Sequence, residues 1–276
     1  MRKLFILFAA LAFPLTVLAG GKGKLTAYIP EGEGLKKAVV ICPGGSYFWL
    51  DRKTEGREVA GWLNNNGIAA FVLDYKVAGG FNFITDMRFL YGGSCYPESV
   101  EELMRAIREI RTDAERYGID PSGIGAMGFS AGGHLAMLAT QEEDRIVDGI
   151  SSKPDFVVSV YPVVTMSDER YVHRRSRRGL MGVNSGNRAL RAKLSLEKNV
   201  PDDCCPVFLV NCSDDNVVDP HNSFLLDEAL TGKGVSHEYH CFPSGGHGFG
   251  LAPTITGTGT PDWGRELLRW FSDLEK

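Results

Sequence analysis

The sequence predicts an α/β protein with a doubly wound, mostly parallel sheet and helices on both faces. Two observations lead to this fold class. Short apolar runs rich in β-branched and aromatic residues recur along the chain, and segments with helical periodicity separate them. The runs are apolar throughout, which is typical of parallel strands buried on both faces. Strands are expected over residues 37–42, 68–73, 124–129, 156–161, 207–211 and 238–242.

Apolar residues three and four positions apart predict the helices that cover this sheet. The clearest pattern ends at Gly118, and Pro121 follows, as expected where a helix stops and the chain turns into a strand. Residues 165–203 interrupt the alternation because they are polar, basic and lack long apolar runs. We expect them to form an insertion over the C-terminal edge of the sheet, where such folds bind ligands. Helices are expected over residues 53–63, 99–117, 131–140 and 263–274.

The N-terminus has the features of a cleavable signal peptide. Two basic residues precede an apolar run over residues 4–13, and small residues lead up to Ala19. Pro14 leaves the run short of the roughly 20 apolar residues that a membrane span needs. No cysteine follows the cleavage site, which disfavours a lipid anchor. We expect removal of residues 1–19, a secreted or periplasmic protein, and no stable membrane insertion afterwards.

Residues 20–276 are expected to form one domain, and composition limits its partners. A hydrophobic content of 43% fits a globular core, and a net charge of -4 gives no reason to expect nucleic acid as a partner. The basic run Arg174–Arg178 is short and lies among polar residues. A solvated loop is therefore favoured over an acid-binding patch. The oligomeric state is left open.

Six cysteines in an exported chain invite disulfides, but their spacing shows no regular framework. Three of them lie within or at the ends of predicted strands, where a small buried thiol packs well. No Cys-x-x-Cys pair indicates zinc or redox chemistry. Pairing stays open for Cys42, Cys95, Cys204, Cys205, Cys212 and Cys241.

The stretch GFSAGGHLA, residues 128–136, places Ser130 between glycines. In a chain with 33 Gly this pattern decides little by itself. Its context decides more, because a predicted strand leads into the serine and a predicted helix follows it. Such a turn lifts a hydroxyl out at the sheet edge, and side chains at Gly128 and Gly132 would clash with neighbouring backbone. We therefore interpret Ser130 as a nucleophile rather than as part of a packing turn.

Two further glycine-rich loops complete this chemistry. CPGGSY, residues 42–47, follows a predicted strand directly, and its glycines let backbone N–H groups face a developing oxyanion. GGHGFG, residues 245–250, follows the last predicted strand and gives His247 the reach of a general base. Five other histidines compete. His134 lies one turn into the nucleophile helix and is expected to be a packed core histidine. The others are His173 in the basic insertion, His221 at a helix start, and His237 and His240 in a strand.

The acid that orients the histidine should follow a strand end and fall between serine and histidine in the chain. Asp214 and Asp215 qualify, so that one can face His247 while the other holds the turn; Asp215 is favoured. Asp168, after the preceding strand, is a weaker rival. A metal site at His237-Glu238-x-His240 is disfavoured, because helical metalloprotease pairs have two histidines four apart. No metal or cofactor is expected.

With these motifs in order, the chain resembles the α/β-hydrolase serine esterases of the acetylxylan-esterase and carboxylesterase type, a group labelled BD-FAE-like. The resemblance implies an α/β-hydrolase fold with Ser130 as nucleophile and His247 as base. The family's Asp-x-x-Val pattern falls on Asp215, and its oxyanion donors fall on the backbone of Gly45, Ser46 and Ala131. Ser46 stands where the family usually has a third glycine. The motifs are CPGGSY, Glu55-Gly56, NGIAAFVL (66–73), Tyr96-Pro97, GIDPSGIGAMGFSAGGHLA (118–136), DDNVVDPHNS (214–223) and GGHGFG.

These residues predict a two-step acyl transfer to and from a serine. Tyr47 and Trp49 follow the oxyanion loop and are expected to contact a sugar, although packing against the sheet is the expected role for at least one neighbouring aromatic. The lack of a long apolar lid favours a short acyl group, and export with the resemblance implies a small-molecule or carbohydrate ester such as acetylated xylan.

Two other functions stay open at this point. A serine peptidase of the prolyl-oligopeptidase type shares the motif order, but such enzymes usually carry a large N-terminal domain that this sequence lacks. A non-catalytic binding protein on the same scaffold would be expected to have lost the serine or the histidine, and both are present.

Overall fold

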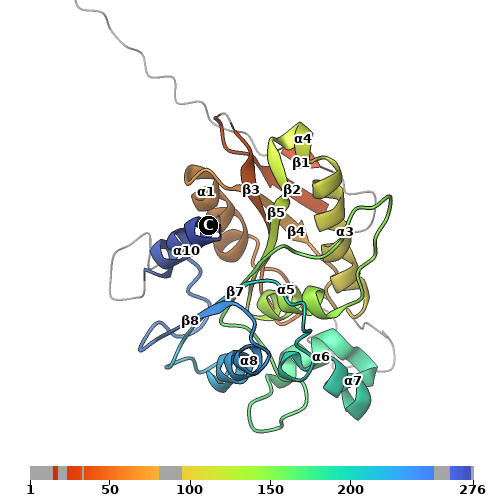
Figure 1. Cartoon of the computed structure of the whole chain (residues 1–276). Coiled ribbons are helices and arrows are strands. Elements are labelled where there is room, and N and C mark those ends of the chain that lie inside the picture. Colours follow the sequence, from red (N-terminus) through yellow and green to blue (C-terminus); the bar gives the residue numbers. More distant parts are fainter. Residues whose placement is uncertain (1–14, 18–23, 33, 81–94, 252–261, 275–276) are drawn as a thin grey trace, which may run out of the picture.

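A computed structural model describes residues 15–17, 24–32, 34–80, 95–251 and 262–274 of the chain, and its centre is an eight-stranded sheet (Figure 1). The strand order is β1-β2-β4-β3-β5-β6-β7-β8. The β1–β2 and β2–β4 pairs are antiparallel, and the five other pairs are parallel. The strands are β1 (Leu15–Val17), β2 (Lys24–Tyr28), β3 (Lys36–Cys42), β4 (Ala69–Asp74), β5 (Ile119–Phe129), β6 (Val157–Val160), β7 (Val207–Cys212) and β8 (His237–Phe242).

All six predicted strands are present, so the predicted mostly parallel sheet is confirmed. The two antiparallel pairs involve β1 and β2, which the apolar-run criterion missed. β2 has the sequence KLTAY and alternates between buried and more exposed residues, so it forms no continuous apolar run. β1 lies inside the segment expected to be removed as a signal peptide, which would leave β2 at the edge of the mature sheet.

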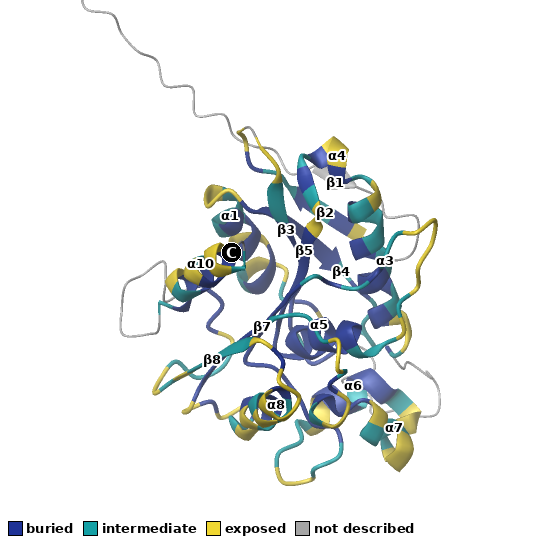
Figure 2. Ribbon diagram, in the orientation of Figure 1, coloured by how far each residue is buried: buried dark blue, intermediate teal, exposed yellow. Residues whose placement is uncertain are grey.

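Helices cover both faces of the sheet. α3 (Glu98–Thr112), α5 (Ala131–Gln141) and α8 (His221–Gly232) pack on one face, and α1 (Glu58–Asn65) and α10 (Trp263–Asp273) pack on the other. Figure 2 shows the buried strands between these two helical layers. Shorter elements are the π-helical turn η1 (Lys53–Arg57), α4 (Ala114–Tyr117), α6 (Arg174–Met181), η2 (Gly182–Gly186), α7 (Arg188–Lys193) and η3 (Leu196–Lys198).

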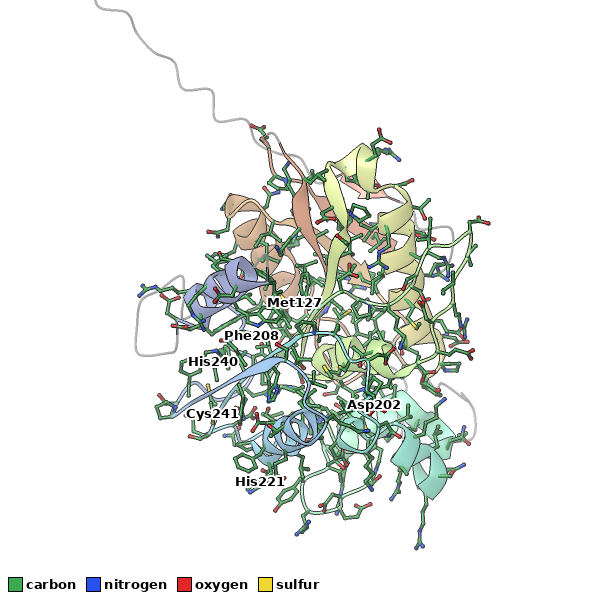
Figure 3. The ribbon with its side chains drawn as sticks, viewed as in Figure 1. Met127, Asp202, Phe208, His221, His240 and Cys241 are labelled. Atoms are coloured by element: carbon green, nitrogen blue, oxygen red, sulfur yellow. The ribbon has the colours of Figure 1, made fainter. Side chains whose placement is uncertain are left out.

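The alternation of side chains along the strands assigns residues to the two cores. In β3, Val40 faces the core under α3 and α5, while its neighbours Val39 and Ile41 face the core under α1 and α10. Figure 3 shows Phe208 of β7 and His240 of β8 close together, and their rings stack at 4.8 Å. His240 is thus used in packing, and its Nε2 also meets Glu238 at 3.1 Å.

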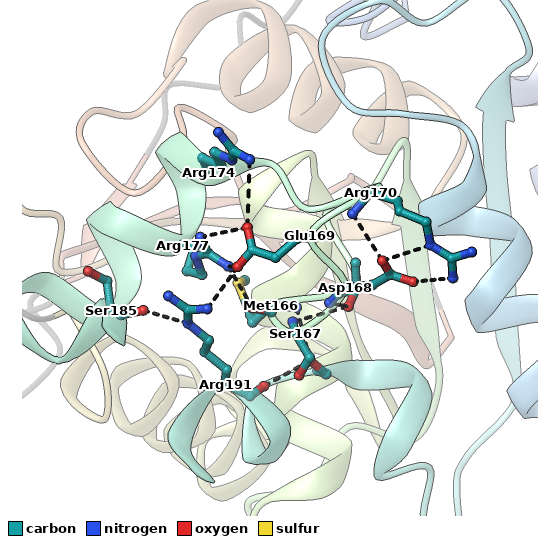
Figure 4. A network of polar contacts seen from close by, with 11 residues as sticks. Met166, Ser167, Asp168, Glu169, Arg170, Arg174, Arg177, Ser185 and Arg191 are labelled. Atoms are coloured by element: carbon teal, nitrogen blue, oxygen red, sulfur yellow. Dashed lines mark hydrogen bonds and ion pairs between the residues drawn. The ribbon is translucent and has the colours of Figure 1, made fainter. Parts of the chain in front are cut away.

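The basic run is helical rather than a loop, which corrects the expectation for Arg174–Arg178. These residues form the first part of α6, because Leu180 and Met181 are fully buried and anchor an amphipathic helix. Arg177 is itself buried and donates to Glu169 at 2.7 Å, while Arg174 and Arg191 approach the same carboxylate (Figure 4). Glu169 therefore forms ion pairs with three arginines and connects α6 to α7.

All six cysteines are free thiols. Cys42 and Cys212 are buried, as expected for strand positions, and Cys95 is buried as well. Cys241 is exposed on β8, so the expectation that it packs as a buried thiol is wrong. In the described part of the chain β8 is the last strand of the sheet, with β7 as its one neighbour. None of the helices in the described ranges combines the length and apolar character of a membrane span.

Candidate active site

Ser130 stands on a strained turn between β5 and α5. Its φ of 54° lies in the left-handed region, which non-glycine residues rarely adopt. A Cβ at Gly128 would overlap with the carbonyl oxygen of Gly132, and a Cβ at Gly132 would overlap with that of Cys42. The expected steric need for glycine at these two positions is therefore confirmed. The turn also leaves the serine at the N-terminus of α5, where the helix dipole favours developing negative charge.

This close backbone approach makes a testable difference between glycines. Gly132→Ala is expected to destabilise the protein by roughly 3 kcal/mol or more, because backbone rather than side chains must move. Gly61→Ala in α1 is the matched control: apart from its own helix and chain neighbours, no atom of the described residues lies within 4 Å of its new Cβ. It is expected to stabilise by about 0.5 to 1 kcal/mol through helix propensity. Urea unfolding measures both, and equal midpoints for the two variants would contradict this account.

His247 connects Ser130 to Asp215. Its Nε2 lies 2.9 Å from Ser130 Oγ, and its Nδ1 lies 2.6 Å from Asp215 Oδ2. The other oxygen of Asp215 accepts hydrogen bonds from the amides of Val217 and Val218 at 2.9 and 3.0 Å. Ser130, Asp215 and His247 follow β5, β7 and β8, whose carboxyl ends share one sheet edge because these strands are parallel. The structure thus brings the three predicted residues into one hydrogen-bonded chain.

The neighbouring aspartates hold other parts of the site. Asp214 accepts hydrogen bonds from the amides of Gly246 at 2.8 Å and Gly245 at 3.2 Å, so it shapes the turn before His247. This matches the expectation that one of the two adjacent aspartates faces the histidine while the other holds the turn. Asp168 instead pairs with Arg170 at 2.7 Å.

The oxyanion loop, residues 43–47, lies against the serine. A Cβ at Gly44 would lie 3.0 Å from Ser130 Cβ and 2.7 Å from the Phe129 carbonyl oxygen. The next residues have positive φ, 137° at Gly45 and 56° at Ser46, which turns their peptide groups. Within the residues that the structure describes, the amides of Gly45, Ser46 and Ala131 donate to no acceptor. Such unpaired N–H groups at a helix N-terminus and a tight loop can receive an anionic oxygen.

Of the two aromatic residues predicted to contact a sugar, one is buried and the other is exposed. Tyr47 is fully buried, and its hydroxyl donates to His134 Nδ1 at 2.8 Å. The expectation that Tyr47 contacts substrate is therefore wrong, because its positive φ turns the side chain into the core. Trp49 is 41% exposed, and its contact with a sugar stays a prediction.

His134 is a core histidine, as expected. It is fully buried, and its Nε2 lies 2.9 Å from the Leu194 carbonyl oxygen, so Nε2 carries the proton. Burial lowers the pKa of His134 to about 4, although the hydrogen bond to Leu194 raises it. The residue stays neutral and joins Tyr47 of the oxyanion loop to the segment after α7.

The inserted segment forms one wall of the site. A Cβ at Gly179 of α6 would lie 2.5 Å from the Ser46 carbonyl oxygen, so the helix packs directly on the oxyanion loop. His173 precedes α6 and bonds Ser176 Oγ at 2.8 Å through Nδ1. Burial, followed by the charges of Arg175 and His247, lowers the pKa of His173 to about 4. The insertion therefore lies close to the triad, as its predicted position implied.

Sequence reasoning missed the roles of Glu55 and Tyr161. Glu55 is 5% exposed and accepts from Gly44 N at 2.7 Å and from Tyr161 Oη at 2.8 Å. The Tyr161 ring packs against His247 with centroids 4.8 Å apart. The sequence signal for Glu55 is the Glu55-Gly56 pair, which belongs to the motifs of the family resemblance but has no role assigned by it. A buried acid near a glycine loop needs a partner, and that partner lies 106 residues away.

The sheet topology and the serine turn after β5 define this chain as a protein of the α/β-hydrolase fold. The sequence matches the family described as BD-FAE over residues 25–230. Because this match covers more than half of the chain, the protein belongs to the BD-FAE family. The resemblance noted in the sequence is thereby confirmed.

Three known proteins illustrate the relationship. An endo-1,4-beta-xylanase B of Butyrivibrio fibrisolvens is 34% identical over 83% of this chain, and an acetylxylan esterase of Xylanibacter ruminicola is 30% identical over 87% of it. The crystal structure of an acetyl ester-xyloside bifunctional hydrolase from Caldicellulosiruptor lactoaceticus superposes with a TM-score of 0.79 at 33% identity. That similarity covers 93% of this chain and 89% of the other. The chain spans only 35% and 46% of the first two proteins.

Proposed function

We propose that the protein is an exported serine esterase that removes short acyl groups, with acetyl esters on a polysaccharide such as acetylated xylan as its substrates. The observation that carries this proposal is the hydrogen-bonded chain Ser130–His247–Asp215 beside unpaired backbone amides. These are the groups that acyl transfer requires: a nucleophile, a base, a group that orients the base, and donors for an oxyanion.

The proposed reaction has two steps. Asp215 accepts a hydrogen bond from the Nδ1–H of His247, which leaves Nε2 free to accept the Ser130 proton as Oγ attacks the ester carbonyl. The carbonyl oxygen becomes negative and is received by the amides of Gly45, Ser46 and Ala131, each such donor being worth roughly 3 to 4 kcal/mol. As the ester C–O bond to the sugar breaks, the imidazolium gives its proton to the departing sugar oxygen, which leaves as a hydroxyl. Water then attacks the acyl-serine by the same route and releases the acid.

The substrate class rests on the relatives and on the surroundings of the site. Two of the relatives that are at least 30% identical, an acetylxylan esterase and an acetyl ester-xyloside bifunctional hydrolase, have names that refer to acetyl esters with xylan or xyloside. α6, which covers one side of the oxyanion loop, carries four arginines and is no apolar lid for a long acyl chain. The half-exposed Trp49 next to this loop offers a surface on which a sugar ring can stack.

Acetate release from acetylated xylan tests the proposal. We expect acetate from acetylated xylan and p-nitrophenol from p-nitrophenyl acetate, with much slower release from the octanoate. A prolyl-oligopeptidase-like activity would instead cleave a prolyl-peptide p-nitroanilide. Absence of acetyl-ester hydrolysis would reject the esterase proposal, and cleavage of the amide alone would favour the peptidase.

Export is part of the proposal and rests on the basic and apolar pattern of the first residues. We propose cleavage after Ala19, so that the mature chain begins at Gly20. Expression of the full-length chain in a bacterium followed by N-terminal sequencing of the periplasmic or secreted protein checks this. A cell-retained protein that still begins at Met1 would contradict it.

A further inference from the structure

We propose that Glu55 is a positioning residue of this reaction: it fixes the oxyanion loop relative to the histidine loop, residues 243–250, by bonding Gly44 and Tyr161 together. The inference rests on the proposed esterase function. In the described contacts Glu55 forms hydrogen bonds with neither the reacting serine nor the histidine, so it positions the two loops through its partners; the nearby His247 also lowers the pKa of Glu55.

The Glu55 carboxylate is the acceptor for two donors that converge from different loops. Its Oε2 accepts from the Gly44 amide at 2.7 Å, and its Oε1 accepts from the Tyr161 hydroxyl at 2.8 Å. Burial raises the pKa of Glu55, while the hydrogen bonds from Tyr161 and Gly44 lower it. Two hydrogen bonds compensate for the burial of this carboxylate, which would otherwise be unfavourable.

The direction of each hydrogen bond can be assigned. The Tyr161 oxygen accepts from the Gly250 amide at 3.1 Å, so the tyrosine uses its own proton toward Glu55. The Gly44 amide can only donate. The resulting order is Gly250 N–H to Tyr161 O–H to Glu55, with Gly44 N–H donating to Glu55 from the other side. An amide at residue 55 would present hydrogens to at least one of these donors, so the order requires a carboxylate.

Each end of this series of hydrogen bonds supports one part of the site. Gly44 packs on Ser130 and directly precedes Gly45, the first of the proposed oxyanion donors. At the other end, Gly250 follows His247 by three residues, and its carbonyl oxygen accepts from Trp263 Nε1 at 2.9 Å. A shift of about 1 Å between such groups can lower a rate by roughly 10²-fold. Glu55 thus lies where a small error would separate the oxyanion donors from the base.

The local backbone around Glu55 is specialised for this position. Residues Lys53–Arg57 form a π-helical turn, closed by a hydrogen bond of 3.0 Å from Arg57 N to Arg52 O. Isolated π-helical turns occur frequently at functional sites. The same turn touches the histidine loop, because a Cβ at Gly250 would lie 3.0 Å from Thr54 Cγ2. The extra residue of the turn aims Glu55 between the two loops.

Replacing Glu55 with glutamine tests this role. Glu55→Gln is expected to lower kcat for p-nitrophenyl acetate about 10²-fold with KM within about twofold, because the active-site geometry changes and substrate binding does not. Glu58→Gln is the matched control, since Glu58 is exposed only three residues further on, in the first turn of α1, and should retain wild-type kcat. Tyr161→Phe should lower kcat by a smaller factor, and its effect should not add to that of Glu55→Gln.

If Glu55 only stabilised the fold, its replacement would reduce the concentration of working sites and leave kcat per working site unchanged. The concentration of working sites is measured from the burst of p-nitrophenol, and thermal unfolding is followed for each variant. The inference is overturned if kcat per working site is unchanged in Glu55→Gln, or if the effects of the two single changes add. Glu55→Asp and Tyr161→Phe provide the same readout if Glu55→Gln does not fold.

The positioning role of Glu55 can be tested even if the proposed esterase function fails. If wild-type protein hydrolyses no ester, the labelling rate of Ser130 by an alkyl fluorophosphonate replaces turnover, because that reaction also needs the base and the oxyanion donors. A wild-type protein that is labelled faster than Glu55→Gln supports the positioning role without esterase turnover. Equal labelling, or no labelling of either protein, overturns it.

Discussion

Ser130→Ala is expected to lower kcat for p-nitrophenyl acetate by roughly 10⁴- to 10⁶-fold, while the fold stays intact. Without Oγ no acyl-enzyme can form, and only the backbone donors and substrate binding still act. The residual rate measures what those donors contribute without the nucleophile. Initial rates of p-nitrophenol release, with circular dichroism to verify folding, provide the comparison.

Ser159→Ala is the matched control for this change. Ser159 lies in β6 and is fully buried, but its hydroxyl donates to the Gly133 carbonyl oxygen at 3.3 Å. Its loss is expected to reduce stability by about 1 kcal/mol and to leave kcat within about twofold of wild type. If Ser130→Ala retains more than a hundredth of the wild-type rate, or if Ser159→Ala loses as much, Ser130 is not the nucleophile.

Asp215→Asn is expected to lower kcat by about 10⁴-fold because it reverses the histidine tautomer. Asp215 Oδ1 accepts hydrogen bonds from two backbone amides, and these amides would hold the carbonyl oxygen of the new asparagine in the same position. Its NH₂ group would then face His247 Nδ1, which must become an acceptor. The imidazole proton would move to Nε2, which could no longer take the Ser130 proton.

Asp214→Asn is the comparison that the adjacent residue provides. Among the described residues its carboxylate accepts hydrogen bonds from backbone amides of the histidine loop, so one of these bonds can survive the change. We expect kcat to fall by less than about tenfold, because the tautomer of His247 is unaffected. The kcat values of both variants on p-nitrophenyl acetate distinguish the two aspartates. A larger loss in Asp214→Asn than in Asp215→Asn would reverse their assignment.

Much of the fold could be predicted because burial on both faces of a parallel sheet leaves continuous apolar runs in the sequence. β3, with the sequence KKAVVIC, is such a run, and it lies where it was expected. β2 could not be found this way, since only alternate residues are buried. The basic run was expected to be a loop because its own residues show no apolar pattern. The helix α6 is stabilised instead by the buried Leu180 and Met181 at its end and by Glu169, which lies outside the helix.

The position of the nucleophile could also be predicted, since it depends on local geometry. A side chain at Gly128 or Gly132 would overlap with backbone, so the glycines around Ser130 record a close approach of two chain segments. Tyr47 could not be placed in the same way. Its direction depends on positive φ at Ser46 and Tyr47 and on a partner, His134, which lies 87 residues away.

The sequence by itself determined the six apolar strands and the main helices between them, the turn at Ser130 and the glycine loops around it. These features depend on periodicity and on local steric limits, which neighbouring residues encode. Only the tertiary structure decided which aspartate meets His247, that Tyr47 is internal, and that Glu55 and Tyr161 join two loops. Those contacts depend on the relative placement of loops distant in sequence, and hydrogen bonds a few ångströms long select among residues that local patterns leave equivalent.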